Sequence, residues 1–152
     1  MKAARKAVFP AVPWQRCQFH LQRNAQAYVP KQDMRAAVAQ TLRAIFTAPE
    51  REEAERLLKL AIAKFEKTAP KLATWMEENL HEGLTVFAFD PAHRVRLRTS
   101  NMLERLNKEI KRRTRVATLF PNEKSLLRLV TAVVGEIDDE WTTGKIYLGM
   151  KS

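Results

Sequence analysis

The spacing of apolar residues along the chain predicts a mostly α-helical protein. Apolar side chains recur three and four residues apart in four segments, a period that places them on one face of a helix. The clearest stripe precedes Phe65, and we expect Pro49 at the first position of its helix. The four apolar stripes cover residues 34–46, 54–65, 72–80 and 126–137.

The first thirty residues alternate between chain breaks and short runs. Residues 2–9 predict the end of a helix, which two prolines then interrupt. Polar and apolar side chains alternate from Trp14 to His20, which favours a short strand. The helical period resumes at Leu21, so we expect a short helix over residues 21–28.

Residues 70–97 predict one helix followed by an irregular connection. Pro70 is expected to open the helix and Gly83 to end it. Residues 84–97 alternate only loosely around Asp90 and Pro91, so no regular structure is expected there.

Residues 98–115 predict a strongly basic helix that carries one acidic residue near its start. Leu103, Leu106 and Ile110 form a narrow apolar stripe that can dock on a core, and Glu104 lies beside this stripe. The basic side chains are the expected phosphate contacts, and Arg94 and Arg96 would extend them. These contacts are Arg98, Arg105, Lys108, Lys111, Arg112, Arg113 and Arg115.

Composition and charge point to a polyanionic partner. The 152 residues fit one domain or a piece of a larger one, with 45% hydrophobic residues. The formal net charge is +10, with 27 Lys and Arg against 17 Asp and Glu. Residues 94–115 contribute nine basic and two acidic residues, so most of the excess charge lies there. Such local charge favours a DNA-binding face over a merely soluble surface.

Glu104 has two interpretations. Asn101 followed three residues later by Glu104 is a helix-capping pattern, and Lys108 is in position to form a helical ion pair with Glu104. Alternatively, a divalent cation would bridge Glu104 to a DNA phosphate and remove their repulsion. Spacing alone favours the structural interpretation.

Cysteine usage and hydropathy predict a cytoplasmic protein. Cys17 is the only cysteine, so no internal disulfide can form. No apolar run approaches the about 20 residues that span a bilayer, and the N-terminal sequence lacks a signal-peptide pattern. We therefore expect no membrane association.

Two separated blocks of sequence resemble one known family, the Mutator-type transposases of bacterial insertion sequences. The first block runs from Gln15 to Val29 and includes a Cys-x-x-His motif made by Cys17 and His20. The second runs from Arg98 to Asn107 and is followed by Phe120-Pro121 and Trp141. The order and spacing of the blocks agree with the family over nearly the whole chain.

The resemblance implies a DDE transposase with a ribonuclease H-like fold. Members carry two aspartates and one glutamate, and a helical insertion separates the fifth strand from the glutamate-bearing helix. The implied fold class here is a partial ribonuclease H-like α/β domain with an α-helical insertion. Residues 1–20 would be a core fragment comprising a helix end and the last strand, residues 21–97 the insertion, and residues 98–152 the C-terminal helices of the catalytic core.

The resemblance also assigns the site residues. Glu104 would be the third acidic ligand for Mg²⁺ or Mn²⁺ and the catalytic residue of this chain. Cys17, His20 and Asn101 would lie near the catalytic centre. A zinc site at Cys17 and His20 is the alternative, but no second cysteine and only two further histidines are present.

The expected function is that of a C-terminal fragment of a DDE transposase acting in DNA transposition. Both aspartates are expected upstream of residue 1, so the chain alone would be catalytically incomplete. Its partners would be transposon ends and target DNA, with a second copy or a full-length transposase, in the bacterial nucleoid. The alternatives are a non-enzymatic helical DNA-binding module and a protein-interaction remnant. Trp14, Trp75 and Trp141 are assigned to packing.

Overall fold

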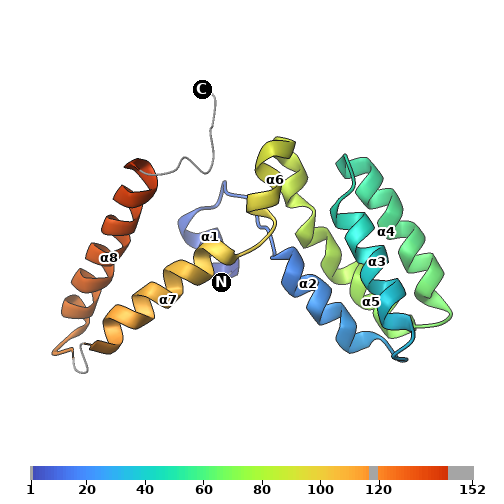
Figure 1. Cartoon of the computed structure of the whole chain (residues 1–152), viewed down its shortest axis with the longest axis horizontal. Helices are drawn as coiled ribbons and strands as arrows, with labels where there is room; N and C mark the ends of the chain where they lie inside the picture. Colours follow the sequence, from blue (N-terminus) through green and yellow to red (C-terminus); the bar gives the residue numbers. More distant parts are fainter. Residues whose placement is uncertain (1, 117–119, 144–152) are drawn as a thin grey trace. The chain divides into compact units, whose positions relative to one another are not determined.

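The computed structural model describes residues 2–116 and 120–143, and the regular structure of these residues is helical. The chain forms two compact units, unit 1 (Met1–Thr99) and unit 2 (Ser100–Ser152) (Figure 1). Unit 1 contains α1 (Lys2–Val8), α2 (Gln18–Ala25), η1 (Gln26–Tyr28), α3 (Met34–Phe46), α4 (Arg51–Glu66), α5 (Pro70–Asn79), η2 (Leu80–Gly83), η3 (Thr85–Ala88) and α6 (Pro91–Leu97). Unit 2 contains α7 (Asn101–Val116) and α8 (Glu123–Thr143).

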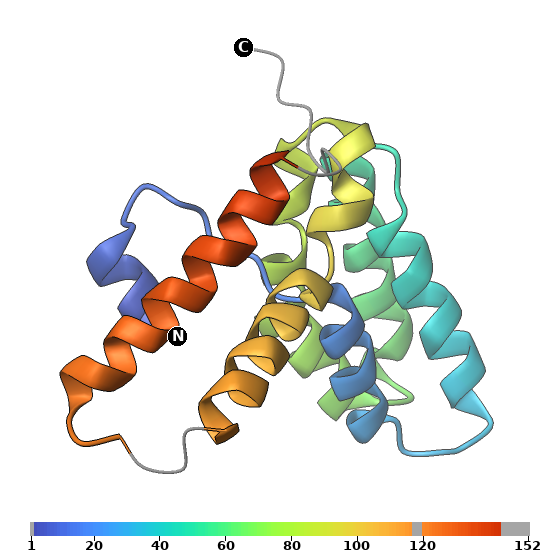
Figure 2. The ribbon, with the colours of Figure 1, turned by 60° about the vertical axis from the view of Figure 1, so that its left-hand side comes forward.

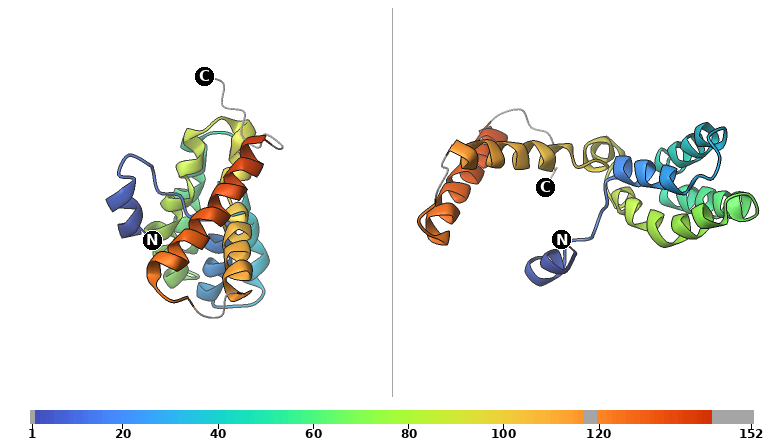
Figure 3. Two further views of the ribbon diagram at one scale, coloured as in Figure 1. Left: turned by 90° about the vertical axis from the view of Figure 1, so that its left-hand side faces the viewer. Right: turned by 90° about the horizontal axis from the view of Figure 1, so that it is seen from below.

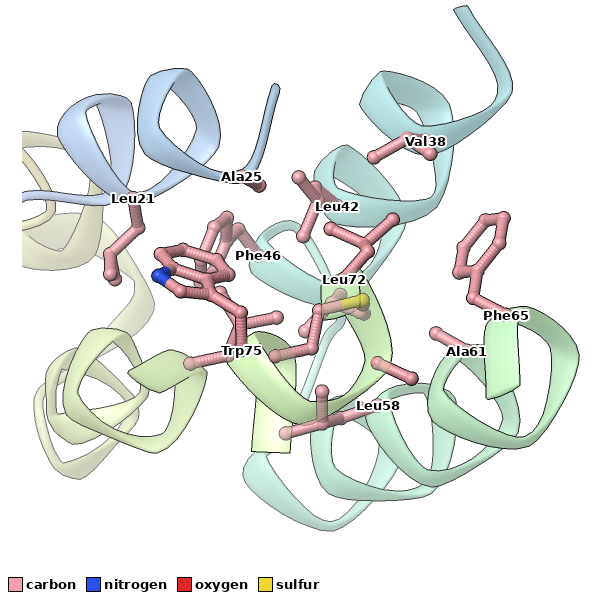
Figure 4. Packing of buried hydrophobic residues seen from close by; sticks show 14 of the residues in the cluster. Leu21, Ala25, Val38, Leu42, Phe46, Leu58, Ala61, Phe65, Leu72 and Trp75 are labelled. Atoms are coloured by element: carbon pink, nitrogen blue, oxygen red, sulfur yellow. The ribbon is translucent and has the colours of Figure 1, made fainter. Parts of the chain in front are cut away.

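Unit 1 is built around one apolar core, to which α2, α3, α4 and α5 each present a stripe. These helices lie together in both views of Figure 3. Leu42, Leu58 and Leu72 are fully or almost fully buried, at 0 to 1% exposure. Figure 4 shows these leucines with Trp75, whose ring stacks on Tyr28 with a centroid separation of 5.5 Å. Burial of such side chains contributes about 1.5–3 kcal/mol each, so the bundle is held mainly by apolar packing.

The mostly α-helical prediction is confirmed, but the strand expected over residues 14–20 is wrong. Residues 14–17 have no regular structure, and α2 already begins at Gln18. The backbone here pairs with a turn instead of a neighbouring strand: the amide of Arg16 donates to the carbonyl of Glu82 at 2.8 Å. The described residues contain no β-strand, so the structure gives no support to a ribonuclease H-like α/β class.

Two further expectations about helix limits are wrong. Residues 84–97 are not irregular, because they form η3 and α6. Asp90 caps α6 by accepting the amide of Ala92 at 2.9 Å, and Pro91 occupies the first turn. Pro49 does not open α4, since Glu50 is the extended N-cap residue and the helix begins after it. The expected helices before Phe46, before Phe65 and from Pro70 are present.

The expected packing of the tryptophans holds in unit 1 but not at the end of α8. Trp75 is buried, and half-buried Trp14 donates from Nε1 to a carboxylate oxygen of Glu82 at 3.3 Å. Trp141 is exposed among the described residues. None of the described helices is long and apolar enough to span a membrane. The expected roles of residues 1–20 and 98–152 as parts of a catalytic core, and of residues 21–97 as its helical insertion, stay predictions.

Candidate nucleic-acid interface

Glu104 lies exposed in the first turn of α7. The hydroxyl of Ser100 donates to its carboxylate at 2.5 Å, and the backbone amide of Glu104 donates to the carbonyl of Ser100 at 2.8 Å. Asn101, the expected cap, is already the first helical residue. The local contact that stabilises the start of α7 therefore involves Ser100, one residue before the position indicated by the capping pattern.

A row of cations follows Glu104 along α7. Lys108, Lys111 and Arg115 are exposed and are spaced three and four residues apart, so they share one side of the helix. An open hollow on this surface is lined by Glu104, Asn107, Lys108, Lys111, Arg112 and Arg115. The structure thus brings Glu104 and four of the expected phosphate contacts to one surface. Arg105 lies on a second hollow of unit 2, which it shares with Lys108 and Arg112.

The side of α7 that packs on α8 differs from the expected stripe. Figure 2 shows the two helices side by side. Leu106 and Ile110 are half-buried together with Met102, whereas Leu103, expected in the stripe, is 55% exposed. Met102, Leu106 and Ile110 are spaced four residues apart, which aligns them on one line of the helix. The expected apolar stripe of α8 is also only partly buried, because Val133 is buried whereas Leu127 and Val134 are exposed.

Three expected site residues belong to unit 1. Half-buried Cys17 is the N-cap residue of α2, and exposed His20 lies in the first turn of that helix. The imidazole of His20 meets the ring of Phe19 edge-on, with centroids 5.5 Å apart. Arg98 follows α6, and its carbonyl accepts the backbone amide of Gln18 at 2.9 Å.

The described residues do not assemble a metal site. No group of three or more His, Cys, Asp and Glu side chains in residues 2–116 and 120–143 is arranged to hold an ion. Two-metal phosphoryl transfer needs carboxylates on both sides of the scissile phosphate. Glu104 alone does not fit that requirement.

Comparison with known proteins identifies the family of this chain. The model of the family "Transposase, Mutator family" matches residues 1–144. The chain belongs to the Mutator family of transposases. Over 97% of its length it is 62% identical to the transposase for insertion sequence element IS406 of Burkholderia multivorans, of which it covers 38%. It is 38% identical to the ISRM5 transposase of Rhizobium meliloti over 97% of the chain, and covers 37% of that protein.

A more distant relative gives the same family. The chain is 34% identical to the IS1081 transposase of Mycobacterium tuberculosis over 98% of its length, and covers 36% of that protein. This Mutator-family chain therefore spans less than two fifths of the length of these relatives.

In this Mutator-family chain, Arg113 has a structural role that the sequence did not indicate. Its guanidinium donates to Glu109 on α7 at 2.9 Å and to Glu136 on α8 at 2.5 and 3.0 Å. Arg112 adds a two-pronged contact to Glu109 at 2.9 and 2.7 Å. The pair of Glu109 and Arg113 has a recognisable helical spacing, but Glu136 lies 23 residues away. Arg113 therefore joins the two helices, and its contact with phosphate stays a prediction.

The arginines beside Glu109 predict an unusually acidic carboxyl group. Hydrogen bonds from Arg112 and then Arg113 lower the pKa of Glu109 from 4.5 to about 2. A carboxyl group with a lowered pKa stabilises the fold above its unfolded pKa, so this contribution is present above pH 4.5 and is lost as the pH falls toward 2. We expect carbon-detected NMR to show Glu109 titrating near pH 2.

A double variant provides the control for this titration. Replacing Arg112 and Arg113 by methionine removes all three hydrogen bonds to Glu109, so its titration should move upward toward the ordinary value of 4.5. A wild-type midpoint already near 4.5 would contradict the arrangement of ion pairs in unit 2.

Proposed function

We propose that this chain is the C-terminal part of a DDE transposase, which binds DNA through α7 and contributes Glu104 to metal-dependent strand cleavage and transfer in the intact enzyme. Membership of the Mutator family supports the proposal, as do the insertion-sequence transposases to which the chain is similar. In the intact enzyme, the expected ribonuclease H-like core would supply the two aspartates.

The observation that carries the proposal is the cationic side of α7. Lys108, Lys111 and Arg115 repeat along one exposed side of this helix. A repeated array of cations can follow the phosphates of a DNA backbone, and neutralising each phosphate releases counterions. DNA phosphates, at transposon ends and in the target, are the partner that matches this surface.

Glu104 lies on the same hollow as these cations, so a DNA backbone bound there would pass near its carboxylate. A carboxylate beside phosphates is a suitable ligand for Mg²⁺ or Mn²⁺. One carboxylate cannot hold two ions about 3.5–4 Å apart, so we propose that the chain alone does not cleave DNA. A full-length transposase, or an assembly containing one, would complete the site.

A second candidate function is a non-enzymatic helical DNA-binding module. The hydrogen bond from Ser100 favours it, because that contact gives Glu104 a purely structural role at the start of α7. The two functions differ in the effect of Mg²⁺. At constant ionic strength, Mg²⁺ would strengthen DNA binding through Glu104 only if the carboxylate shares an ion with a phosphate.

The proposed function is tested by incubating the purified chain with transposon-end DNA and Mg²⁺ or Mn²⁺. We expect DNA binding without nicking, and we expect Glu104→Gln to remove the part of the affinity that depends on Mg²⁺. Nicking that disappears in Glu104→Gln would contradict the proposed incompleteness. If Mg²⁺ changes the DNA affinity of the wild-type chain and of Glu104→Gln equally, the non-enzymatic module is favoured. Absence of DNA binding at low salt would contradict both functions.

A further inference from the structure

Residues 14–17 have no regular structure, and together with Gln18, the first residue of α2, they are held by a segment more than sixty residues later. This segment, residues 79–86, comprises the end of α5, η2 and the start of η3 and is here called the docking turn. The hydroxyl of Thr85 donates to the carbonyl of Trp14 at 2.7 Å. The side-chain amide of Gln15 accepts the amide of Val86 at 2.9 Å and donates to the carbonyl of Gly83 at 3.1 Å. Both backbone and side chains of residues 14–18 are therefore bound by the docking turn.

Arg16 forms the second part of this attachment. Its backbone amide donates to the carbonyl of Glu82 at 2.8 Å, and its guanidinium donates to the side-chain oxygen of Asn79 at 2.9 Å. The carboxylate of Glu82 also accepts from Arg16 at 3.5 Å. These bonds attach Arg16 to Asn79, just before η2, and to Glu82 within η2.

Gln18 connects three parts of the chain at once. Gln18 is 3% exposed, and among the described residues it is the one polar side chain that is buried. Its side-chain amide donates to the carbonyl of Gly83 at 2.8 Å, and its backbone amide donates to the carbonyl of Arg98 at 2.9 Å. The first residue of α2 is thus bonded to the residue that follows α6.

The docking turn is itself packed against the core. A Cβ atom at Gly83 would lie 2.7 Å from Leu21 and 2.9 Å from Phe46, closer than van der Waals contact permits. The absence of a side chain at residue 83 lets the turn approach α2 and α3. Its carbonyl is thereby placed where Gln15 and Gln18 can both reach it.

We propose that Arg16 and Gln18 are positioning residues, which hold the two flanks of the helical segment 18–98 side by side. The functional meaning rests on the proposed transposase function. One flank ends at Cys17, and the other continues from Thr99 into the helix that carries Glu104. The attachment therefore determines where the chain leading into α7 leaves unit 1.

The experiment exploits the single natural cysteine of the full chain. Thr99→Cys adds a second thiol at the residue after Arg98, and Cys17 is the residue before Gln18, so the two thiols flank the hydrogen bond between Gln18 and Arg98. A short bismaleimide should join the two thiols rapidly in this background. Adding Arg16→Met or Gln18→Met should slow the cross-linking about tenfold, because either change removes side-chain hydrogen bonds that attach residues 14–18 to the docking turn and so keep Gln18 beside Arg98. Replacing Arg16 by lysine instead of methionine should keep most of the cross-linking rate.

Matched controls use the same substitutions at exposed positions of unit 1. Arg23→Met and Gln40→Met should leave the cross-linking rate unchanged. Amide exchange on the same samples separates positioning from folding: the amide of Gln18 should exchange about tenfold faster in the Arg16→Met and Gln18→Met variants, while the amides of Leu58 and Leu72 keep their protection.

Equal cross-linking rates in the positioning and control variants would overturn the inference. Faster exchange of all core amides together in both variants would also overturn it, since the two side chains would then merely support the bundle. DNA binding by the same samples reports separately on the proposed function. A chain that cross-links as expected but does not bind DNA would contradict the transposase role and leave the positioning role intact.

Discussion

Replacing Lys111, Arg112 and Arg115 by alanine is expected to weaken DNA binding by about a hundredfold at low salt. The three side chains are three of the four cations that line one hollow on α7, so their loss leaves only Lys108 there. Phosphate contacts carry no sequence information, and affinity for all DNA sequences should therefore fall together. The slope of log affinity against log salt should become shallower by about three. Fluorescence anisotropy at several salt concentrations measures both effects.

The control for this variant has the same change in net charge. Lys59, Lys67 and Lys71 are exposed on α4, at its end and on α5, and replacing them by alanine also lowers the net charge of +10 by three. If binding depends only on total charge, the two triple variants will lose equal affinity, which would contradict a specific face on α7. If α7 is the face, the control should keep nearly all of its affinity.

Not all basic side chains of α7 are equally available to DNA. Arg113 is engaged by Glu109 and Glu136, so binding a phosphate would require it to leave two carboxylates. Lys108 and Lys111 keep flexible ammonium groups in exposed positions. This difference explains why the triple variant omits Arg113: its replacement would disturb the contact between α7 and α8 as well as any contact with DNA.

The helices of unit 1 could be predicted because their signal is local. In α4 the apolar residues Ala54, Leu58 and Ala61 lie within two turns of one another, and all three are buried in one core. α6 was missed because its apolar residues are few, although Asp90 followed by Pro91 is a recognisable start signal. The period of hydrophobicity therefore predicts a helix well only where one side faces a core.

The attachment of residues 14–18 to the docking turn could not be predicted, because the partners of these residues are distant in sequence. Alternation from Trp14 to His20 is the pattern of a strand, but the partners of Gln15 and Gln18 lie 65 to 71 residues away in the docking turn. A local pattern contains no information about such pairing. A short extended segment is compatible with a sheet and with an isolated attachment alike.

The candidate site was predicted in part by charge and in part by family resemblance. The charge pattern predicted a DNA-binding face on α7, where Glu104 and the row of cations share one hollow. Spacing alone favoured a cap at Asn101, and the structure shows that Ser100 makes the contact. A hydroxyl one residue before the helix is equally compatible with the sequence, since helix limits shift easily by one residue.

Leu58→Ala is expected to destabilise unit 1 by about 2–5 kcal/mol. Leu58 is 1% exposed on α4 and packs in the core shown in Figure 4, so truncating it removes buried apolar contacts and leaves a cavity. Urea unfolding followed by far-ultraviolet circular dichroism should show a lower midpoint for this variant.

Leu60→Ala, on the same helix, makes the same chemical change at a side chain that is 54% exposed. It should alter the free energy of unfolding by no more than about 0.5 kcal/mol. The two variants differ only in which side of α4 they affect, so helix propensity contributes equally to both. A loss at Leu60 as large as that at Leu58 would contradict the burial pattern of α4 and, with it, the arrangement of the bundle against which the docking turn packs.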